Sequence, residues 1–265
     1  MNIEEARCGG RRPAPGGGHP EPLGALPPRP VHRVLFRQSW HDLVFLHWEA
    51  DPFEVARLLP SGTAPDLLDG RTYVGLVFFR MYGLAVGRTP PLPHLGTFTE
   101  VNVRLYSRDA CGRRGVVFRS LDCDRLLPVL VARAGFGLPY RWSRTSRRWH
   151  GNRLLYRTRG RGSSRTDAHV RIDVAHESAA PRPLDEFLTC RWGLHERVLG
   201  HTYYLPNAHP AWTFRRCGLL GWDASVVAAA GLTPPVDEPV SVLYAPGVPV
   251  RFGPPVRLPP GRPGH

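Results

Sequence analysis

The ten residues TFTEVNVRLY at positions 97–106 alternate between apolar and polar side chains along almost their whole length. One set of alternate positions is apolar and comprises Val101, Val103 and Leu105. The other set is polar and comprises Glu100, Asn102, Arg104 and Tyr106. A period of two is the signature of a β-strand, because successive side chains of a strand point to opposite faces of the sheet. The stretch therefore predicts a strand with one apolar face and one polar face.

Further strands are expected on both sides of this one. Residues 40–49 and 72–81 are rich in aromatic and β-branched side chains, and the second run is apolar on both faces. Residues 115–121 and 240–252 are further strands, and residues 153–158 and 169–174 are expected to form a hairpin across a polar loop.

Three short helices are expected between the strands. Asp51, Pro52 and Glu54 form a start signal that predicts a helix ending at Pro60. Helical spacing of apolar residues predicts another over 124–136, and Asp223 begins an Ala-rich helix that ends at Gly231. Many strands with few helices indicate a mainly antiparallel α+β fold or a barrel.

The two ends of the chain differ from its middle. Residues 1–30 are rich in Pro and Gly and poor in apolar side chains, so we expect a disordered tail, and residues 254–265 are expected to be a second one. The remaining residues, 31–253, read as a single domain. The N-terminus lacks the apolar region of a secretory signal, and no apolar run reaches the roughly 20 residues of a membrane span. We expect a cytoplasmic protein without membrane association.

The chain carries a formal net charge of +13, and all 35 of its Lys and Arg residues are arginine. Scarce Ile and Gln alongside abundant Gly, Ala, Pro and Arg are typical of GC-rich coding. We therefore interpret the positive charge as a compositional bias rather than as the signature of a nucleic-acid binder. The five cysteines are widely spaced without a C-x-x-C pair, and we expect reduced thiols with no zinc site.

Several segments, taken in order, resemble one family. These are LHW (46–48), LLP (58–60), TFTEVNVRLY (97–106), ARAGFGLPY (132–140), LTCRW (188–192) and HPAW (209–212). The series resembles the YqjF-like family of bacterial proteins, domain of unknown function 2071. That family is similar to the acetoacetate-decarboxylase-like superfamily. The resemblance implies a cone- or barrel-like antiparallel sheet that encloses a pocket, with a few short helices outside.

The same resemblance suggests where a site would lie. FGLPYR (136–141) is similar to the decarboxylase stretch that supplies the Schiff-base lysine, so Tyr140 stands at the position of that lysine and Arg141 at its neighbour. Glu100 is similar to the pocket glutamate, and Cys190 stands where the family often has a glutamate. The resemblance turns the polar face of 97–106 inward, and Glu100, Asn102, Arg104, Tyr140 and Arg141 become the candidate ligand-binding residues.

The chemistry of these residues limits what the site does. Imine formation needs an unprotonated amine, and a guanidinium stays charged, so a chain without lysine has no Schiff-base decarboxylase activity of that kind. Buried Glu100 would have its pKa raised by desolvation and lowered by Arg104. The candidate catalytic groups are Glu100 and Tyr140, and whether the protein is an enzyme is left open.

We therefore expect a pocket for a small anionic or carbonyl-bearing molecule, with no cofactor and no metal. One alternative is a lysine-independent acid–base enzyme that uses Glu100 and Tyr140. Another is a nucleic-acid or polyanion binder acting through the Arg-rich segment 141–165, where aromatic residues interleave with arginines. His195, His201 and His209 match no zinc-ligand spacing. A homo-oligomer is compatible with the sequence.

Overall fold

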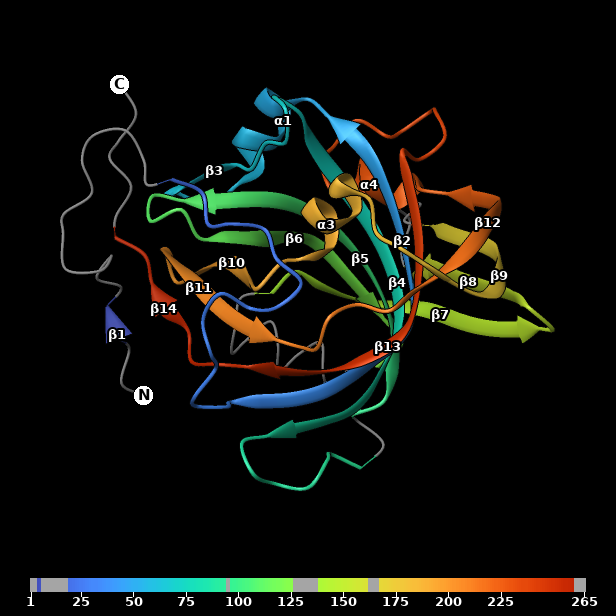
Figure 1. Cartoon of the computed structure of the whole chain (residues 1–265), viewed down its shortest axis with the longest axis horizontal. Coiled ribbons are helices and arrows are strands. Elements are labelled where there is room, and N and C mark those ends of the chain that lie inside the picture. Colours follow the sequence, from blue (N-terminus) through green and yellow to red (C-terminus); the bar gives the residue numbers. More distant parts are fainter. Residues whose placement is uncertain (1–3, 6–18, 94–95, 126–137, 162–166, 260–265) are drawn as a thin grey trace.

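The structure is a computed structural model that describes residues 4–5, 19–93, 96–125, 138–161 and 167–259 (Figure 1). One sheet of fourteen strands carries three short helices within these residues. The strands are β1 (Glu4–Glu5), β2 (Phe36–Ala50), β3 (Thr63–Pro65), β4 (Thr72–Val86), β5 (Phe98–Asp109), β6 (Arg114–Cys123), β7 (Tyr140–His150), β8 (Arg153–Gly160), β9 (Ala168–Ala179), β10 (Gly193–Val198), β11 (His201–Ala208), β12 (Phe214–Asp223), β13 (Ser241–Phe252) and β14 (Val256–Arg257). The helices are α1 (Pro52–Leu58), α3 (Pro183–Thr189) and α4 (Ser225–Ala229).

Five antiparallel strands, in the order β13–β2–β4–β5–β6, form the wall of the molecule. Each end strand of the wall forks. The free edge of β6 pairs with β10 at Val116 and with β7 at residues 121–123, and the free edge of β13 pairs with β12 at Tyr244 and with β11 at residues 251–252. The sheet therefore closes twice around the same wall.

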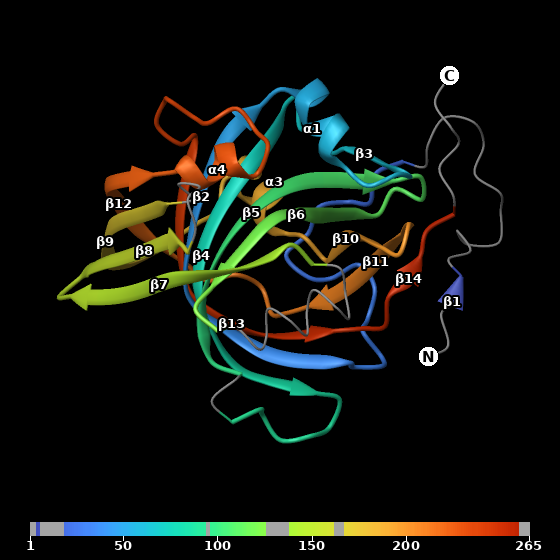
Figure 2. The same ribbon diagram turned by 180° about the vertical axis from the view of Figure 1, so that it is seen from behind.

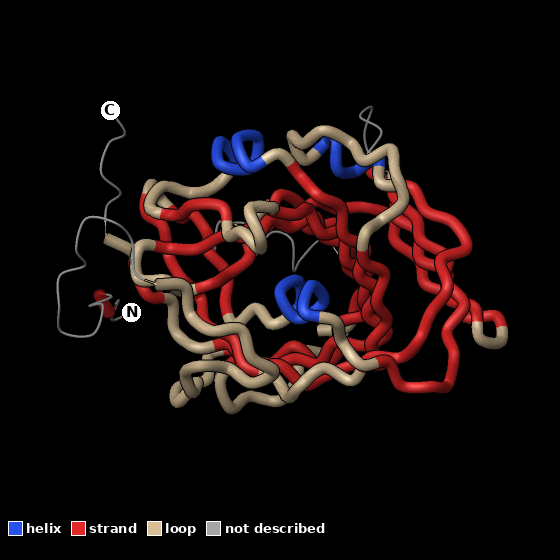
Figure 3. The backbone as a smooth tube through the Cα atoms, turned by 45° about the horizontal axis from the view of Figure 1, so that its top comes forward, coloured by secondary structure: helices blue, strands red, loops and turns tan. Residues whose placement is uncertain are grey.

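The first closure runs through β7, β8, β9 and β12, and the second runs through β10 and β11. We call these closures the core ring and the cavity ring. Figure 3 shows the strands curling into a ring with α3 inside its outline, and Figure 2 shows β7, β8, β9 and β12 projecting to one side. The mainly antiparallel, cone- or barrel-like sheet expected from the resemblance is confirmed.

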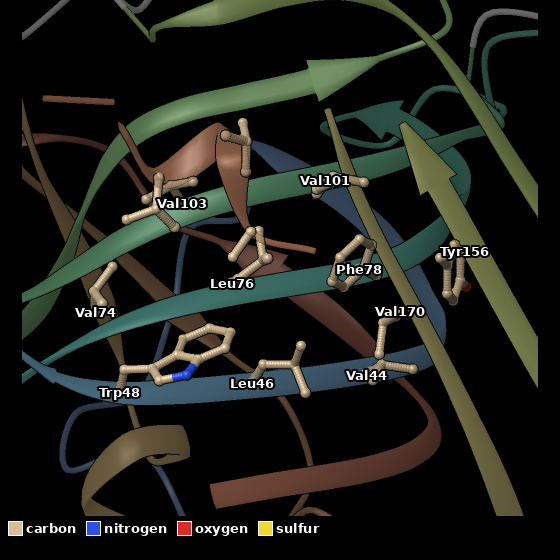
Figure 4. Close-up of a cluster of buried hydrophobic side chains, with 14 of the residues drawn as sticks. Val44, Leu46, Trp48, Val74, Leu76, Phe78, Val101, Val103, Tyr156 and Val170 are labelled. Carbon is tan, nitrogen blue, oxygen red and sulfur yellow. The ribbon is translucent and has the colours of Figure 1, made fainter. Parts of the chain in front are cut away.

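The alternation of residues 97–106 decides which side chains face which ring. The wall contributes Val44, Leu76, Phe78, Val101 and Val103 to the core ring, where they are almost wholly shielded from solvent (Figure 4). Their neighbours in sequence face the cavity ring instead. Both faces of the wall are thus buried, so the polar set on β5 is not the solvated face that alternation alone would predict.

Local sequence explains where the helices α1 and α3 begin. The side chain of Asp51 accepts a hydrogen bond from the backbone N–H of Phe53 at 2.9 Å, and Pro52 occupies the first helical position of α1. On α3, Asp185 accepts a hydrogen bond from the backbone N–H of Arg182 at 2.9 Å. Phe187 and Leu188 of α3 are fully buried, so this helix packs inward against the cavity ring.

Most expected elements match the structure. The expected strands at 40–49, 72–81, 97–106, 115–121 and 240–252 lie at β2, β4, β5, β6 and β13, and the expected hairpin is the β8–β9 pair. Seven strands, β1, β3, β7, β10, β11, β12 and β14, and the helix α3 have no counterpart in the sequence-based predictions. The helix expected over 124–136 lies almost entirely outside the described residues.

Segments expected to be tails contact the body. The backbone N–H of Glu21 donates to Gly112 O at 2.9 Å, and the Trp192 indole donates to Gly24 O at 3.2 Å. At the other end β14 pairs with β11, and the N–H of Leu258 donates to Thr202 O at 2.8 Å. These contacts move the proposed boundaries of the folded body outward from 31–253. Residues 1–3, 6–18 and 260–265 of the expected tails lie outside the described ranges.

Two further expectations concern membranes and thiols. Among the described residues, no helix has the length and apolar composition that a membrane span requires. Cys123, Cys190 and Cys217 are free thiols, whereas Cys111 is disulfide-bonded, so the expectation of reduced thiols throughout was wrong. Sequence spacing does not reveal which distant cysteines meet in space.

Candidate functional site

A cavity of about 230 Å³ lies on the cavity-ring side of the wall. Its described lining is mainly aromatic and aliphatic. The polar and charged side chains in that lining are Gln38, Glu100, Asn102, Arg104 and Tyr140. An apolar cavity with a few convergent polar groups is the usual form of a small-molecule site. Four of the five residues predicted to bind a ligand therefore line one cavity.

Glu100 and Tyr140 form the closest polar pair in this lining. Glu100 is paired in register with Cys123, and Tyr140 with Leu121, so β6 brings the two residues together from either side. The phenol of Tyr140 donates a hydrogen bond to Glu100 Oε2 at 2.7 Å. Glu100 is only 2% exposed. The carboxyl and the phenol thus share one short, almost dry hydrogen bond.

Burial changes the acidity of both groups. Desolvation raises the pKa of Glu100 to about 7, and the hydrogen bonds from Tyr140 and Asn102 oppose this shift. Burial and the charge of Glu100 raise the pKa of Tyr140 well above its usual value. Near neutral pH Tyr140 keeps its proton, while Glu100 is close to half protonated. Such a carboxyl is able to give or take a proton at physiological pH.

Asn102 lies one step along the same strand face. Its Nδ2 donates to Glu100 Oε1 at 3.4 Å, and its Oδ1 is buried without a partner among the described residues. An unpaired buried carbonyl costs free energy unless something bonds to it. Asn102 Oδ1 is thus an acceptor that a ligand in the cavity could satisfy.

Arg104 provides the positive charge of the cavity. Its Nε donates to the Tyr106 hydroxyl at 3.2 Å and its Nη2 donates to Leu188 O at 2.9 Å, while the guanidinium lies 5.4 Å from the ring centre of Phe45. It forms no ion pair with any described carboxylate. Gly75 makes room for it, because a Cβ there would lie 3.2 Å from the Arg104 side chain.

Arg104 was expected to lower the pKa of Glu100, and this effect is absent. The groups that act on the pKa of Glu100 are Tyr140, Asn102 and Asp122, and Arg104 is not one of them. Four residues along a strand separate two Cα atoms by roughly 13 Å. The two charged groups therefore mark opposite parts of the cavity rather than one ion pair.

Arg141 lies apart from the other candidates. It is not among the residues that line the cavity. Its Nη2 donates to Ser120 Oγ at 2.7 Å and to Asp122 Oδ2 at 2.8 Å, and Asp122 is fully buried. Neighbouring residues of a strand point to opposite faces, so Tyr140 and Arg141 could not both face the cavity. Arg141 neutralises a buried carboxylate.

Several residues near the cavity were not predicted from the sequence. Trp40 lines the cavity, and its indole N–H is buried without a partner among the described residues. His47 lies between the rings of Phe45 and Tyr106, and both of its ring nitrogens lack a described partner. Burial, then the charges of Arg104 and Arg191, hold its pKa well below the usual value. The LHW segment was the available signal for His47.

The three histidines considered for a metal each contact a different set of residues. His195 Nδ1 is 2.8 Å from Ser107 Oγ, His201 contacts Arg257, and His209 lies between the tilted rings of Trp192 and Trp212. Within the described ranges, no group of three or more His, Cys, Asp and Glu residues is placed to hold a metal. Ser107 and His195 are fully buried with Asp109 nearby, and none of the three is among the residues that line the cavity.

The described part of the Arg-rich segment, residues 141–161, forms most of the β7–β8 hairpin. Its inward arginines are paired, since Arg147 bonds to Asp42 and Arg141 to Asp122. On the outer face, the guanidinium of Arg161 lies 3.9 Å from the ring centre of Trp142. Trp149 packs edge-on against Tyr244 at 6.0 Å, so it does not belong to the outer face.

The family model of domain of unknown function 2071, described as an uncharacterized conserved protein, matches residues 37–249. The uncharacterized protein YqjF of Bacillus subtilis (strain 168) is 29% identical over 222 residues, which are 83% of this chain and 91% of that protein. The match extends from β2 into β13, so it includes both rings.

Two solved structures are similar in fold. Acetoacetate decarboxylase from Legionella pneumophila superposes with a TM-score of 0.57 at 16% identity, over 91% of this chain and 92% of that one. The enduracididine biosynthesis enzyme MppR complexed with pyruvate has a TM-score of 0.57 at 14% identity, over 84% of this chain and 90% of that one. At these identities the likeness establishes the fold alone.

Proposed function

The chain belongs to the family of domain of unknown function 2071, and on this premise we propose that its cavity binds a small carboxylate or carbonyl compound without Schiff-base chemistry. The observation that carries the proposal is that one face of β5 presents both a positive group and an acidic group to the same cavity. An Arg104 guanidinium without a described acidic partner stands at one part of the cavity, and the Glu100–Tyr140 pair stands at another. The first suits an anion, and the second suits a carbonyl or hydroxyl group.

The chemical class has support from fold and composition. MppR, which shares the fold, is described in complex with pyruvate, a molecule with both a carboxylate and a ketone. The chain has no lysine, and Tyr140 stands where the resemblance places the reactive one. A ketone in this cavity would therefore be bound by hydrogen bonds rather than held as an imine. A cytoplasmic location remains part of the proposal.

Calorimetric titration with pyruvate tests the proposal. We expect binding by the wild-type protein, about tenfold or more weaker binding by Arg104→Gln, and unchanged binding by the exposed control Arg216→Gln. Borohydride added with pyruvate should leave the intact mass unchanged. Equal affinity in wild type and Arg104→Gln, or a reduced adduct, would contradict the proposal. Native mass spectrometry of protein from its own host would identify a retained ligand.

Acid–base catalysis is a second candidate, favoured by the raised pKa of Glu100. Glu100 would remove a proton from the carbon beside the carbonyl, the electron pair would move to the oxygen as an enolate, and Tyr140 would hydrogen-bond that oxygen. Return of a solvent deuteron would then label the substrate. Proton NMR of pyruvate in deuterated buffer should show loss of the methyl signal with wild type but not with Glu100→Gln.

Nucleic-acid or polyanion binding is the remaining candidate, and the outer face of β7–β8 with Trp142 and Arg161 is its support. Arg141 and Arg147 face inward and are paired with Asp122 and Asp42, so they add no free charge to that face. We expect weak oligonucleotide binding that disappears near physiological salt, because phosphate neutralisation alone is strongly salt-dependent. Submicromolar affinity at that salt concentration would favour this candidate over the small-molecule proposal.

A further inference from the structure

A second cavity of about 500 Å³ lies along β2, β4, β11 and β13. Small side chains make room for it, including Ser39, Gly83, Ala85 and Ala208. Two charged residues, Arg37 and Arg251, also line it, and no described Asp or Glu does. Gln38 lines both this cavity and the first one. The second cavity is thus a separate hollow next to the first, and the charged residues in its described lining are both positive.

The two arginines are direct cross-strand partners. Arg251 of β13 is in register with Arg37 of β2. Like charges placed opposite each other on adjacent strands repel, and this destabilises a sheet. Neither residue forms an ion pair with any described carboxylate, and both are exposed. The repulsion therefore has no compensating charge within the described protein.

Arg37 is nevertheless held in place. Its Nε donates to Gly87 O at 2.9 Å and its Nη2 donates to Thr89 O at 2.9 Å, so the loop after β4 fixes the plane of the guanidinium. The guanidinium of Arg251 makes no hydrogen bond with the described residues. Arg37 is thus positioned by backbone carbonyls with its Nη1 donors unused. The guanidinium of Arg251 has all its donors available to a ligand.

The histidine in the lining of the second cavity, His209, adds no charge. His209 lines the cavity, but burial lowers its pKa to about 4, so it is neutral at physiological pH. Ser39 offers a hydroxyl on the same outer face, two residues from Arg37. Two guanidiniums and a hydroxyl around an acid-free hollow match the hydrogen-bonding pattern of a tetrahedral oxyanion.

We propose that the second cavity is a binding site for a phosphate group, gripped between Arg37 and Arg251. The phosphate would supply the negative charge that this pair of strands lacks, and binding would therefore stabilise the fold as well. This site is independent of the proposed function of the first cavity. Either proposal can fail without the other.

Inorganic phosphate is the probe for this site, titrated at constant ionic strength against chloride. We expect a saturable rise in the melting temperature of the wild-type protein. Arg251→Gln should weaken phosphate binding about tenfold or more, because a charge-assisted bidentate contact is lost. The exposed arginine Arg216 supplies the matched control, and Arg216→Gln should bind phosphate as the wild type does.

Arg251→Glu gives a readout that does not depend on binding. It places a carboxylate opposite Arg37, so the variant should melt at a higher temperature than the wild type without phosphate and should no longer respond to phosphate. Acetate at equal charge concentration distinguishes a phosphate site from a general carboxylate site. No saturable phosphate effect, an effect that acetate reproduces equally, or equal loss in Arg216→Gln and Arg251→Gln would overturn the proposal.

Discussion

The two faces of the wall strands are equally buried but differ in what they contain. Toward the core ring, β2, β4 and β5 present mainly hydrocarbon and aromatic side chains, such as Val44, Phe78 and Val103. Toward the cavity ring, the same strands also present Glu100, Asn102 and His47, with unpaired polar atoms among them. Stability alone would favour an apolar lining, so the cavity face carries groups that function would have to justify.

The largest expected effect compares two neighbouring phenylalanines of β4. Phe78 is packed in the core ring, whereas Phe79 lines the cavity. Phe78→Ala should lower the free energy of unfolding by about 3–5 kcal/mol, since it opens a void in close-packed surroundings. Phe79→Ala only enlarges an existing space and should cost at least about 1 kcal/mol less. Urea denaturation measures both, and equal losses would show that the faces are packed alike.

A pH series on Glu100→Gln gives the next largest effect. The pKa of Glu100 is about 7 in the folded protein against 4.5 ordinarily, so the folded state binds this proton more tightly than the unfolded state does. Wild-type stability should fall as pH rises from about 4.5 to about 7, by about 3 kcal/mol from this residue, and stay level above that.

Glu100→Gln should lack the part of the pH-dependent loss of stability that Glu100 causes. Glu196, whose pKa burial raises to about 8, produces a similar fall in both proteins and cancels in the comparison. The control Glu238→Gln removes an exposed carboxylate and should leave the wild-type profile in place. Parallel wild-type and Glu100→Gln profiles would mean that Glu100 is solvated, and the contrast between the faces would be lost.

Tyr140→Phe should produce a smaller change. Its phenol donates to Glu100 and lowers the pKa of that carboxyl, so removing the hydroxyl should raise the pKa of Glu100 above about 7. The loss of one charged hydrogen bond is worth about 1–3 kcal/mol. Infrared titration of the protonated carboxyl band, assigned with Glu100→Gln, measures the shift. A downward shift would refute the hydrogen bond, and Tyr203→Phe serves as the control.

Asn102→Leu should have the smallest effect. The substitution removes a 3.4 Å contact to Glu100 and also removes an unpaired buried carbonyl, and these two contributions oppose each other. The free energy of unfolding should change by no more than about 0.5 kcal/mol, while any binding of a carbonyl ligand weakens. A loss above about 1 kcal/mol would mean that the fold itself requires Asn102.

Local patterns predicted the wall but not its surroundings. The period of two in 97–106 and the cap at Asp51 are properties of neighbouring residues, so β5 and α1 followed from the sequence. The strand β7 was missed because Arg141 and Arg147 occupy inward positions and Trp142 an outward one, which hides the alternation. The forks at β6 and β13 depend on pairings between residues far apart in the chain, which periodicity does not encode.

The candidate site was predicted in part for the same reason. The alternation placed Glu100, Asn102 and Arg104 on one face, and the resemblance turned that face inward. Tyr140 came from the resemblance, and the structure places it beside Glu100. Arg141 was grouped with Tyr140 by adjacency, although adjacent strand residues face apart. The unpaired atoms of Trp40 and His47 needed coordinates, since satisfaction of a polar atom is a three-dimensional property.

The forked strand β13 also sets a condition on the order of folding during synthesis. It pairs with β2 near the start of the folded body and with β11 and β12 just before it. The core ring therefore cannot close before Tyr244 has left the ribosome, and the cavity ring cannot close before Phe252 has. Until then β2, β11 and β12 lack the partner that covers these edges. A nascent chain of this protein therefore exposes strand edges late into translation, the stage at which chaperone binding would matter most.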